Sequence, residues 1–363
     1  MFALVQALSL PAQGTILGID KIDSDRVPIS IGRDVIAADV TFGVPDYGTL
    51  RIWRNGAAVA LPEQPPSARS EHAFLALGVV SPAGVPFVDL VQPVDGADIG
   101  IDYDAFRLAG AAWKRVDLKK CRPNEGYAGH ILRIEPSGAL DVSYEHSSHV
   151  FFDEVGTSEY APEATRIVGS RCDHLGTFNL RAVAGAYAVG YRGYLHGGIV
   201  PIGIDTAQQT FKAVSSHDGR VRELGVGEAF DVAPDGFTVG SDAPPFDQSF
   251  GIGNVMYRCC TPHPVAWTAA GEELHLAPKG VRGVAYSTDA SHRIAGSIID
   301  RDGRHYAFLW DHNRLRLLDQ LTPTPGWHFE AAYGFTQDGA VVGVGTKDGV
   351  ATAFIDSLTT RVR

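Results

Sequence analysis

The sequence of 363 residues contains little cysteine and no long apolar run. Its four cysteines, Cys121, Cys172, Cys259 and Cys260, form no Cys-x-x-Cys pair and show no spacing typical of a disulfide framework. No run approaches the roughly 20 apolar residues that cross a bilayer. The first ten residues lack the positive region of a signal peptide, and there is no Asn-x-Ser/Thr sequon. These absences predict a cytoplasmic protein with reduced thiols.

A basic patch is also missing. The formal net charge is -11, and the longest basic cluster is Lys119-Lys120 with Arg122. A nucleic-acid or anionic-membrane surface needs a larger positive patch to neutralise phosphate. The sequence therefore predicts a small-molecule partner, with neither nucleic acid nor membrane, and it leaves the oligomeric state open.

Several well-known catalytic motifs do not occur. There is no Gly-x-Ser-x-Gly nucleophile elbow and no His-Glu-x-x-His metal motif. The run "GIGNVM" at 251–256 lacks the third glycine and the strand-to-helix context of a dinucleotide site. A hydrolase with that elbow, a metalloprotease with that motif and a Rossmann dehydrogenase are thereby excluded.

What the chain does contain is a clear strand pattern at 329–358, "FEAAYGFTQDGAVVGVGTKDGVATAFIDSL". Three apolar runs, Ala331–Phe335, Ala340–Val344 and Ala351–Ile355, are separated by Asp338-Gly339 and Asp348-Gly349. An Asp-Gly pair between apolar segments is a strong hairpin signal, because glycine adopts positive φ without steric cost. The stretch is predicted to be a three-stranded β-meander.

Related hairpins recur along the chain. "TQDGAVVGVG" at 336–345 resembles "APDGFTVGS" at 233–241, with looser relatives further upstream, and the units start near residues 14, 71, 127, 180, 228, 281 and 330. A period of about 50 residues is close to one four-stranded propeller blade. We predict an all-β propeller of seven four-stranded blades in a single domain, residues 1–363. Six or eight blades stay open, because the stretch from His149 to Gly198 has no clear Asp-Gly turn.

The last unit lacks a fourth strand, since only residues 359–363 follow Leu358. The apolar segment 1–10, "MFALVQALSL", is predicted to supply this outer strand by pairing with the blade at 330–363. Such pairing would close the ring and remove exposed sheet edges.

The runs "GAVVGVG", "HYAFLWDHNRLRLLDQL" and "GVATAFIDSL" resemble the bacterial repeat family named for its His-Ala-Phe motif. Repeats of that family consist of a valine-glycine hairpin followed by an Ala-Phe-Leu-Trp strand. The resemblance is good over about 228–358 and faint in the N-terminal half. It implies a β-propeller and says little about activity.

Alignment of the units on their turns places polar residues on the inner strands. Asp20, Arg133 and Asp231 share one position, together with Val79, Ser287 and Gly334. Because side chains alternate along a strand, this position is predicted to face the central channel. The preceding position, Ile19, Gly78, Leu132, Phe230, Tyr286 and Tyr333, is predicted to face the layer between blades.

The mouth of the channel is the predicted site, where loops that enter the inner strands meet the links between second and third strands. Histidine and carboxylate groups there suit general acid–base chemistry near neutral pH. The candidate catalytic residues are Glu71, His72, His130, His196, Tyr257, His328 and Glu330. The candidate substrate-binding residues are Asp20, Arg133, Asp231, Phe246, His263, Arg282 and Trp327.

These residues predict an enzyme that carries out acid–base chemistry on a small polar organic molecule or sugar, as a lyase, isomerase, cyclase or hydrolase. It is expected to need no cofactor, with a divalent metal as the open alternative. A glycan- or protein-binding propeller without catalysis is the second hypothesis. A purely structural scaffold is the third.

Overall fold

The structure is a computed structural model of the chain. It describes residues 15–17, 29–31, 35–39, 50–54, 57–58, 60–62, 74–81, 83–94, 100–123, 127–135, 137–146, 159–160, 162–196, 208–243, 251–252, 255–256, 261–336 and 339–356. Within these residues almost all regular structure is β-strand, and the two short helical turns are η1 (Lys119–Cys121) and α1 (Leu318–Leu321). None of the described helices is long and apolar enough to cross a membrane.

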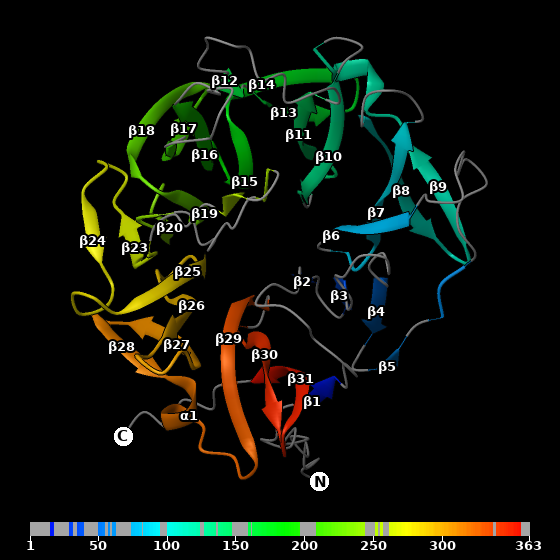
Figure 1. Cartoon of the computed structure of the whole chain (residues 1–363). Helices are drawn as coiled ribbons and strands as arrows, with labels where there is room; N and C mark the ends of the chain where they lie inside the picture. Colours follow the sequence, from blue (N-terminus) through cyan, green and yellow to red (C-terminus); the bar gives the residue numbers. More distant parts are fainter. Residues whose placement is uncertain are drawn as a thin grey trace, which may run out of the picture.

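The strands form antiparallel sheets arranged around a central axis, as in a β-propeller (Figure 1). The first three sheets along the chain contain β2 (Ile29–Ile31), β3 (Val35–Asp39), β4 (Leu50–Arg54) and β5 (Ala57–Ala58); β6 (Phe74–Val80), β7 (Pro86–Val94), β8 (Gly100–Ala109) and β9 (Ala112–Val116); and β10 (Tyr127–Ile134), β11 (Leu140–His146), β13 (Glu163–Val168) and β14 (Arg171–Thr177).

The fourth sheet contains β15 (Asn179–Ala184), β16 (Tyr187–His196), β17 (Gln208–His217) and β18 (Arg220–Val226), and it also includes β12 (Glu159–Tyr160). The fifth sheet contains β19 (Glu228–Val232), β20 (Thr238–Ser241), β23 (Pro264–Trp267) and β24 (Glu273–His275). The sixth sheet contains β25 (Arg282–Thr288), β26 (Ile294–Ile299), β27 (His305–Asp311) and β28 (Arg314–Leu317). A separate two-stranded hairpin consists of β21 (Gly251–Ile252) and β22 (Val255–Met256).

The last sheet combines the two ends of the chain. It contains β29 (Trp327–Phe335), β30 (Val341–Lys347), β31 (Val350–Asp356) and, as its outer strand, β1 (Thr15–Leu17). β1 pairs antiparallel with β31, with Thr15 opposite Ile355 and Leu17 opposite Ala353. The strand in this place is therefore 15–17, whereas the predicted segment 1–10 lies outside the described residues.

The propeller architecture is confirmed, but seven four-stranded blades are not supported as predicted. Among the described residues six sheets have four strands each, and the sheet of β15–β18 has five. The extra strand arises because β12 and β15 both pair with β16, at Gly193–Tyr194 and at Tyr187–Tyr191 respectively. The strands of the irregular pairing, β12, β15 and β16, fall in the stretch 149–198, where no Asp-Gly turn marks the pattern.

The first unit, which was predicted to start near residue 14, starts one strand later in the structure. Its inner strand is β2, at residues 29–31, whereas the strand at 15–17, β1, belongs to the last sheet. The apolar alternation in "PISIG" is the same for a first or a second strand, so the pattern alone could not assign it.

A repeated glycine explains the valine-glycine signature of the units. Gly190, Gly240, Gly296 and Gly343 each lie on a second strand, opposite an inner strand that bulges one residue later. A Cβ at these positions would collide with a backbone carbonyl of the inner strand, from Asn179, Glu228, Val284 and Ala331 respectively. Only glycine permits this close approach of two backbones.

The hydrophobic core lies between neighbouring sheets. Apolar clusters join the β6–β9 sheet to the β10 sheet, and each later sheet to the next, up to the β25–β28 and β29–β31 sheets. Trp267, Phe308 and Phe354 are almost fully buried within them. The fourth strands, such as β24 and β28, remain largely exposed. Each sheet thus packs on two neighbours and leaves its inner strand to line the axis.

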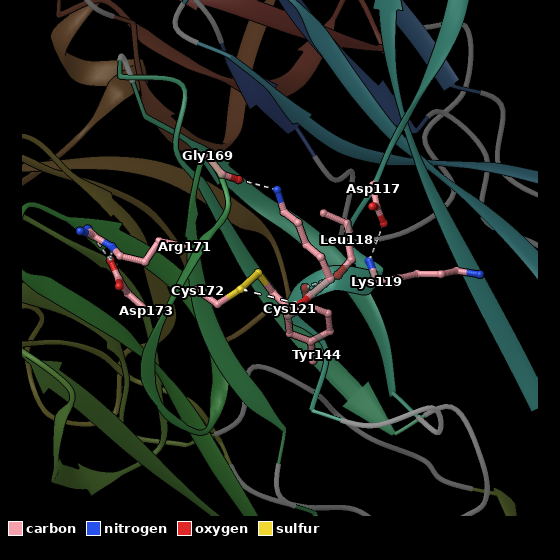
Figure 2. Close-up of a disulfide and its surroundings, with 10 residues drawn as sticks. Asp117, Leu118, Lys119, Cys121, Tyr144, Gly169, Arg171, Cys172 and Asp173 are labelled. Atoms are coloured by element: carbon pink, nitrogen blue, oxygen red, sulfur yellow. Dashed lines mark hydrogen bonds and ion pairs between the residues drawn. A yellow bond between two sulfur atoms is a disulfide. The ribbon is translucent and has the colours of Figure 1, made fainter.

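A disulfide joins Cys121 of η1 to Cys172 of β14, with Cα atoms 5.6 Å apart (Figure 2). The expectation of reduced thiols is wrong for these two cysteines. The pairing escapes a spacing argument because it spans 51 residues and depends on the η1 connector lying against the outer strand β14. Nearby, the Tyr144 hydroxyl donates to the Leu118 carbonyl at 2.7 Å. Cys259 and Cys260 lie outside the described residues.

Candidate functional site

A cavity of about 320 Å³ opens where four inner strands end. It is bounded by the last residues of β10, β15, β19 and β25 and by the turns that follow. Its lining residues are Leu132, Arg133, Arg181, Ala182, Ala184, Asp231, Val232, Ala233, Pro234, Thr288, Asp289 and Ala290. This volume suits one small organic molecule.

The cavity lies at the end of the axis opposite to the predicted mouth. We call the side where inner strands end the strand-end face, and the side where they begin the strand-start face. The predicted site was on the strand-start face, among loops that are largely outside the described residues. The described cavity belongs to the strand-end face, although two of the predicted substrate-binding residues, Arg133 and Asp231, meet in it.

Bulges in the inner strands place these two residues at one level. The register shifts between Ile131 and Arg133 in β10 and between Ala229 and Asp231 in β19. A bulge adds one residue and re-aims the side chains around it. The residue after each bulge is the position that the unit alignment assigned to the channel.

The residues that precede these positions were predicted to face the layer between blades, and three of them form a chain of ring contacts across neighbouring inner strands. The rings of Phe230 and Tyr286 meet at 6.0 Å, and those of Tyr286 and Tyr333 at 4.9 Å. The Arg181 guanidinium lies 6.0 Å from the Phe230 ring. All four side chains remain partly exposed. They form an arc from one inner strand to the next.

Asp231 is held by three donors. Its Oδ2 accepts the Ser287 hydroxyl at 2.7 Å and the Thr288 N–H at 2.9 Å, and its Oδ1 accepts the Val232 N–H at 2.9 Å. Although part of the side chain is accessible from the cavity, burial raises the pKa of this carboxyl, against the hydrogen bonds from Ser287 and Thr288. A carboxyl with a raised pKa is better matched to proton transfer near neutral pH.

Arg133 is the second charged group of the cavity wall. Burial raises the pKa of both Asp231 and Asp141, and the positive charge of Arg133 partly opposes this effect at each carboxyl. Arg133 therefore lies within electrostatic range of both. Among the described residues its guanidinium forms no hydrogen bond and no ion pair. Its donors are therefore available to a ligand in the cavity.

Behind Arg133 lies a buried ion cluster. The Arg166 Nε donates to Asp141 Oδ1 at 2.8 Å, and its Nη2 is 2.8 Å from Glu135 Oε1. Asp141 is fully buried, which raises the pKa of its carboxyl despite Arg166. Its Oδ2 has no hydrogen-bond partner in the described structure. Two carboxylates thus share one guanidinium.

The other two charges of the wall are paired. The Arg181 Nε donates to Glu228 Oε1 at 2.6 Å, and Glu228 is fully buried. The Arg293 Nε donates to Asp289 Oδ2 at 2.6 Å. These pairs fix Arg181 and Asp289 at the rim and neutralise them locally.

Two predicted histidines lie on the strand-start face, each against an aspartate. His263 Nδ1 is 2.9 Å from Asp242 Oδ2, and His328 Nδ1 is 2.8 Å from Asp319 Oδ2. The same aspartates accept the backbone N–H groups of His263 and Phe329. Each aspartate therefore orients an imidazole at the start of a strand.

The remaining described candidates are distributed around the same face. Arg282 begins β25, and its buried Nε has no hydrogen-bond partner in the described structure. Glu330 lies at a bulge of β29, and its carbonyl accepts the Ser297 hydroxyl at 2.8 Å. Trp327 stacks on Phe329 at 5.4 Å and packs against the core. His130 is a half-buried residue of β10, and His196 ends β16.

Five candidates fall outside the described residues, namely Asp20, Glu71, His72, Phe246 and Tyr257. Among the residues that are described, no three His, Cys, Asp or Glu side chains gather as they would around a metal ion.

Arg181, Glu228 and Thr288 were missed from the sequence. "NLRAVAGAYAVG" at 179–190 aligns with "EAFDVAPDGFTVG" at 228–240, which would have placed Arg181 at the level of Phe230. The signal was hidden because the turn at Gly185 is one residue shorter and lacks the Asp-Gly pair.

Comparison with known proteins identifies a fold rather than a family. No protein-family model matches the sequence, and no curated protein matches it. The structure is similar to the β-propeller domain of the Trilobed protease from Pyrococcus furiosus, with a TM-score of 0.53 and 11% identity over 91% of this chain and 95% of that one. It is also similar to an acylaminoacyl peptidase from Pyrococcus horikoshii, with a TM-score of 0.50 and 11% identity. That match covers 93% of this chain and 52% of the peptidase chain, about half its length. At these identities the likeness shows that the chain has a β-propeller fold.

Proposed function

We propose that the chain is a propeller enzyme that transfers protons on a small polar organic molecule or sugar at the strand-end cavity. Asp231 acts as the proton acceptor and donor, and Arg133 anchors a negatively charged or strongly polar group of the substrate. The observation that carries the proposal is a carboxyl of raised pKa and a guanidinium without a bonded partner among the described residues, both in the wall of one cavity of about 320 Å³.

The hydrogen bonds of Asp231 support this role. Ser287 and Thr288 occupy Oδ2, whereas Oδ1 accepts a single backbone N–H from Val232. Oδ1 therefore retains a lone pair for a substrate proton. The three donors fix the carboxyl in one orientation, and general acid–base catalysis requires such positioning.

A single site per chain fits the aromatic arc better than a repeated binding surface does. Phe230, Tyr286 and Tyr333 contact one another around the axis instead of forming a separate pocket on each blade. A glycan- or protein-binding propeller would be expected to bind several equivalents of ligand. The proposed enzyme binds one.

The test compares wild-type protein with Asp231→Asn. A panel of sugars and hydroxy acids is incubated in D₂O, and C–H exchange and new products are followed by NMR. We expect Asp231→Asn to reduce the rate by about a hundredfold or more, as for loss of a general acid–base group. The matched control is Asp173→Asn, on the outer strand β14. The proposal fails if the panel is unchanged by wild-type protein or if Asp231→Asn is as active.

We also propose that the protein is cytoplasmic and that it belongs to the His-Ala-Phe repeat family. The sequence favours the cytoplasm, whereas the Cys121–Cys172 disulfide is typical of an oxidising compartment. Membership of the His-Ala-Phe repeat family is supported by the sequence runs at 228–358 alone.

A further inference from the structure

The charges of the strand-end cavity restrict what it can hold. Arg133, Arg181, Asp231 and Asp289 line it, and two of these four are neutralised by close partners. Arg181 is paired with buried Glu228, and Asp289 with Arg293. Among the lining residues of the described structure, Arg133 is the cation that has no ion pair.

The wall behind Arg133 disfavours a second negative charge. Asp141 and Glu135 share the one guanidinium of Arg166, so apart from Arg133 this wall carries two carboxyl groups and one cation. Asp231 adds a further carboxyl to the lining of the cavity. A ligand with one negative charge can be balanced by Arg133, but a dianion would face uncompensated like charge.

The form of the anchor favours a carboxylate. A guanidinium presents parallel N–H donors that match the two oxygens of a carboxylate. The remaining polar groups, the Asp231 carboxyl and the Thr288 and Asp289 side chains, are suited to ligand hydroxyls. Leu132 and Ala182 supply apolar contact between them.

We infer that the cavity binds a sugar acid that carries a single carboxylate, with the carboxylate on Arg133 and hydroxyl groups toward Asp231 and Thr288. This inference rests on the proposed function for the location of the site, and it adds the substrate class. It excludes neutral sugars and sugar phosphates as the preferred ligands of this cavity.

The test is isothermal titration with three probes that share one ring, namely D-glucuronate, D-glucose and D-glucose 6-phosphate. We expect D-glucuronate to bind wild-type protein with one equivalent per chain, and the other two at least about tenfold more weakly. Arg133→Gln should weaken D-glucuronate at least about tenfold, because the charge-assisted pair is lost. Arg133→Lys, which keeps the charge without the planar fork, should give an intermediate affinity. Equal thermal unfolding of these variants controls for folding.

Outcomes separate this inference from the proposed function. Binding of D-glucuronate that depends on Arg133 supports the inference, whether or not conversion is seen. Equal or tighter binding of D-glucose or D-glucose 6-phosphate, undiminished binding by Arg133→Gln, or no binding of D-glucuronate overturns it. If D-glucuronate does not bind but wild-type protein converts other compounds in a way that depends on Asp231, this inference fails and the proposed function is still supported.

Discussion

Reduction of the Cys121–Cys172 disulfide is expected to destabilise the protein substantially. The bond connects residues 51 apart, so it restricts a long loop in the unfolded chain. The chain-entropy relation for a loop of that length gives about 4 kcal/mol at 25 °C. The η1 connector is also held by the Tyr144 hydroxyl on Leu118 and by the Lys120 ammonium on the Gly169 carbonyl, so the folded state should persist after reduction.

The assay is urea unfolding followed by fluorescence, with and without a phosphine reductant. Reduced protein should unfold at a lower urea concentration, with a free energy of unfolding that is lower by about 2–4 kcal/mol. The Cys121→Ser/Cys172→Ser double variant should match the reduced wild type and should not respond to reductant. This control separates the bond from effects at Cys259 and Cys260. Identical unfolding curves for oxidised and reduced wild type would refute the reasoning.

Four further predictions concern the sheets and the turns between their strands. Gly240→Ala should lower the free energy of unfolding by about 2 kcal/mol in urea unfolding, because its Cβ meets the inner-strand backbone; unchanged stability would contradict this. Arg166→Leu should cost about 3 kcal/mol in the same assay, since fully buried Asp141 loses its ion pair; a neutral effect would count against the pair. Burial raises the pKa of Asp231 above its ordinary 3.8, so its favourable contribution is present below that pH and is lost as pH rises through the folded pKa. Wild type should therefore lose stability relative to Asp231→Asn between pH 4 and pH 7. At Asp235, burial raises the pKa, but hydrogen bonds from Phe237 and His292 outweigh this effect, so the pKa lies below its ordinary value. Wild type should therefore gain stability relative to Asp235→Asn as the pH rises through the acid range. If stability relative to the two variants changes with pH in the same direction, both assignments are wrong.

The strand pattern of the C-terminal half could be predicted because its turns are chemically explicit. Asp348 and Gly349 both have positive φ in the β30–β31 turn, as the Asp-Gly pair requires. Valine-glycine pairs on second strands likewise mark the bulges, since glycine is needed where two backbones meet. Arg133 and Asp231 each follow a bulge, and alignment of the units placed both at the channel position, although the strand opposite Arg133 carries no glycine.

What could not be predicted depends on contacts between segments that are distant in the sequence. The disulfide requires η1 to lie against β14, and the Arg181–Glu228 pair joins two neighbouring inner strands. The cavity is formed by the ends of four inner strands, and no local motif specifies how far apart those ends lie.

The pairing of β1 with β31 has a consequence for the order of folding. Thr15 is synthesised long before its partner Ile355, because the two residues lie far apart in the sequence. Contacts of such long sequence separation form slowly, because the entropy of closing the chain must be lost before the contact is gained. The other sheets can assemble one after another during synthesis, whereas β1 cannot pair until β31 has been made. We therefore expect the slowest folding phase of this protein to report on the last sheet.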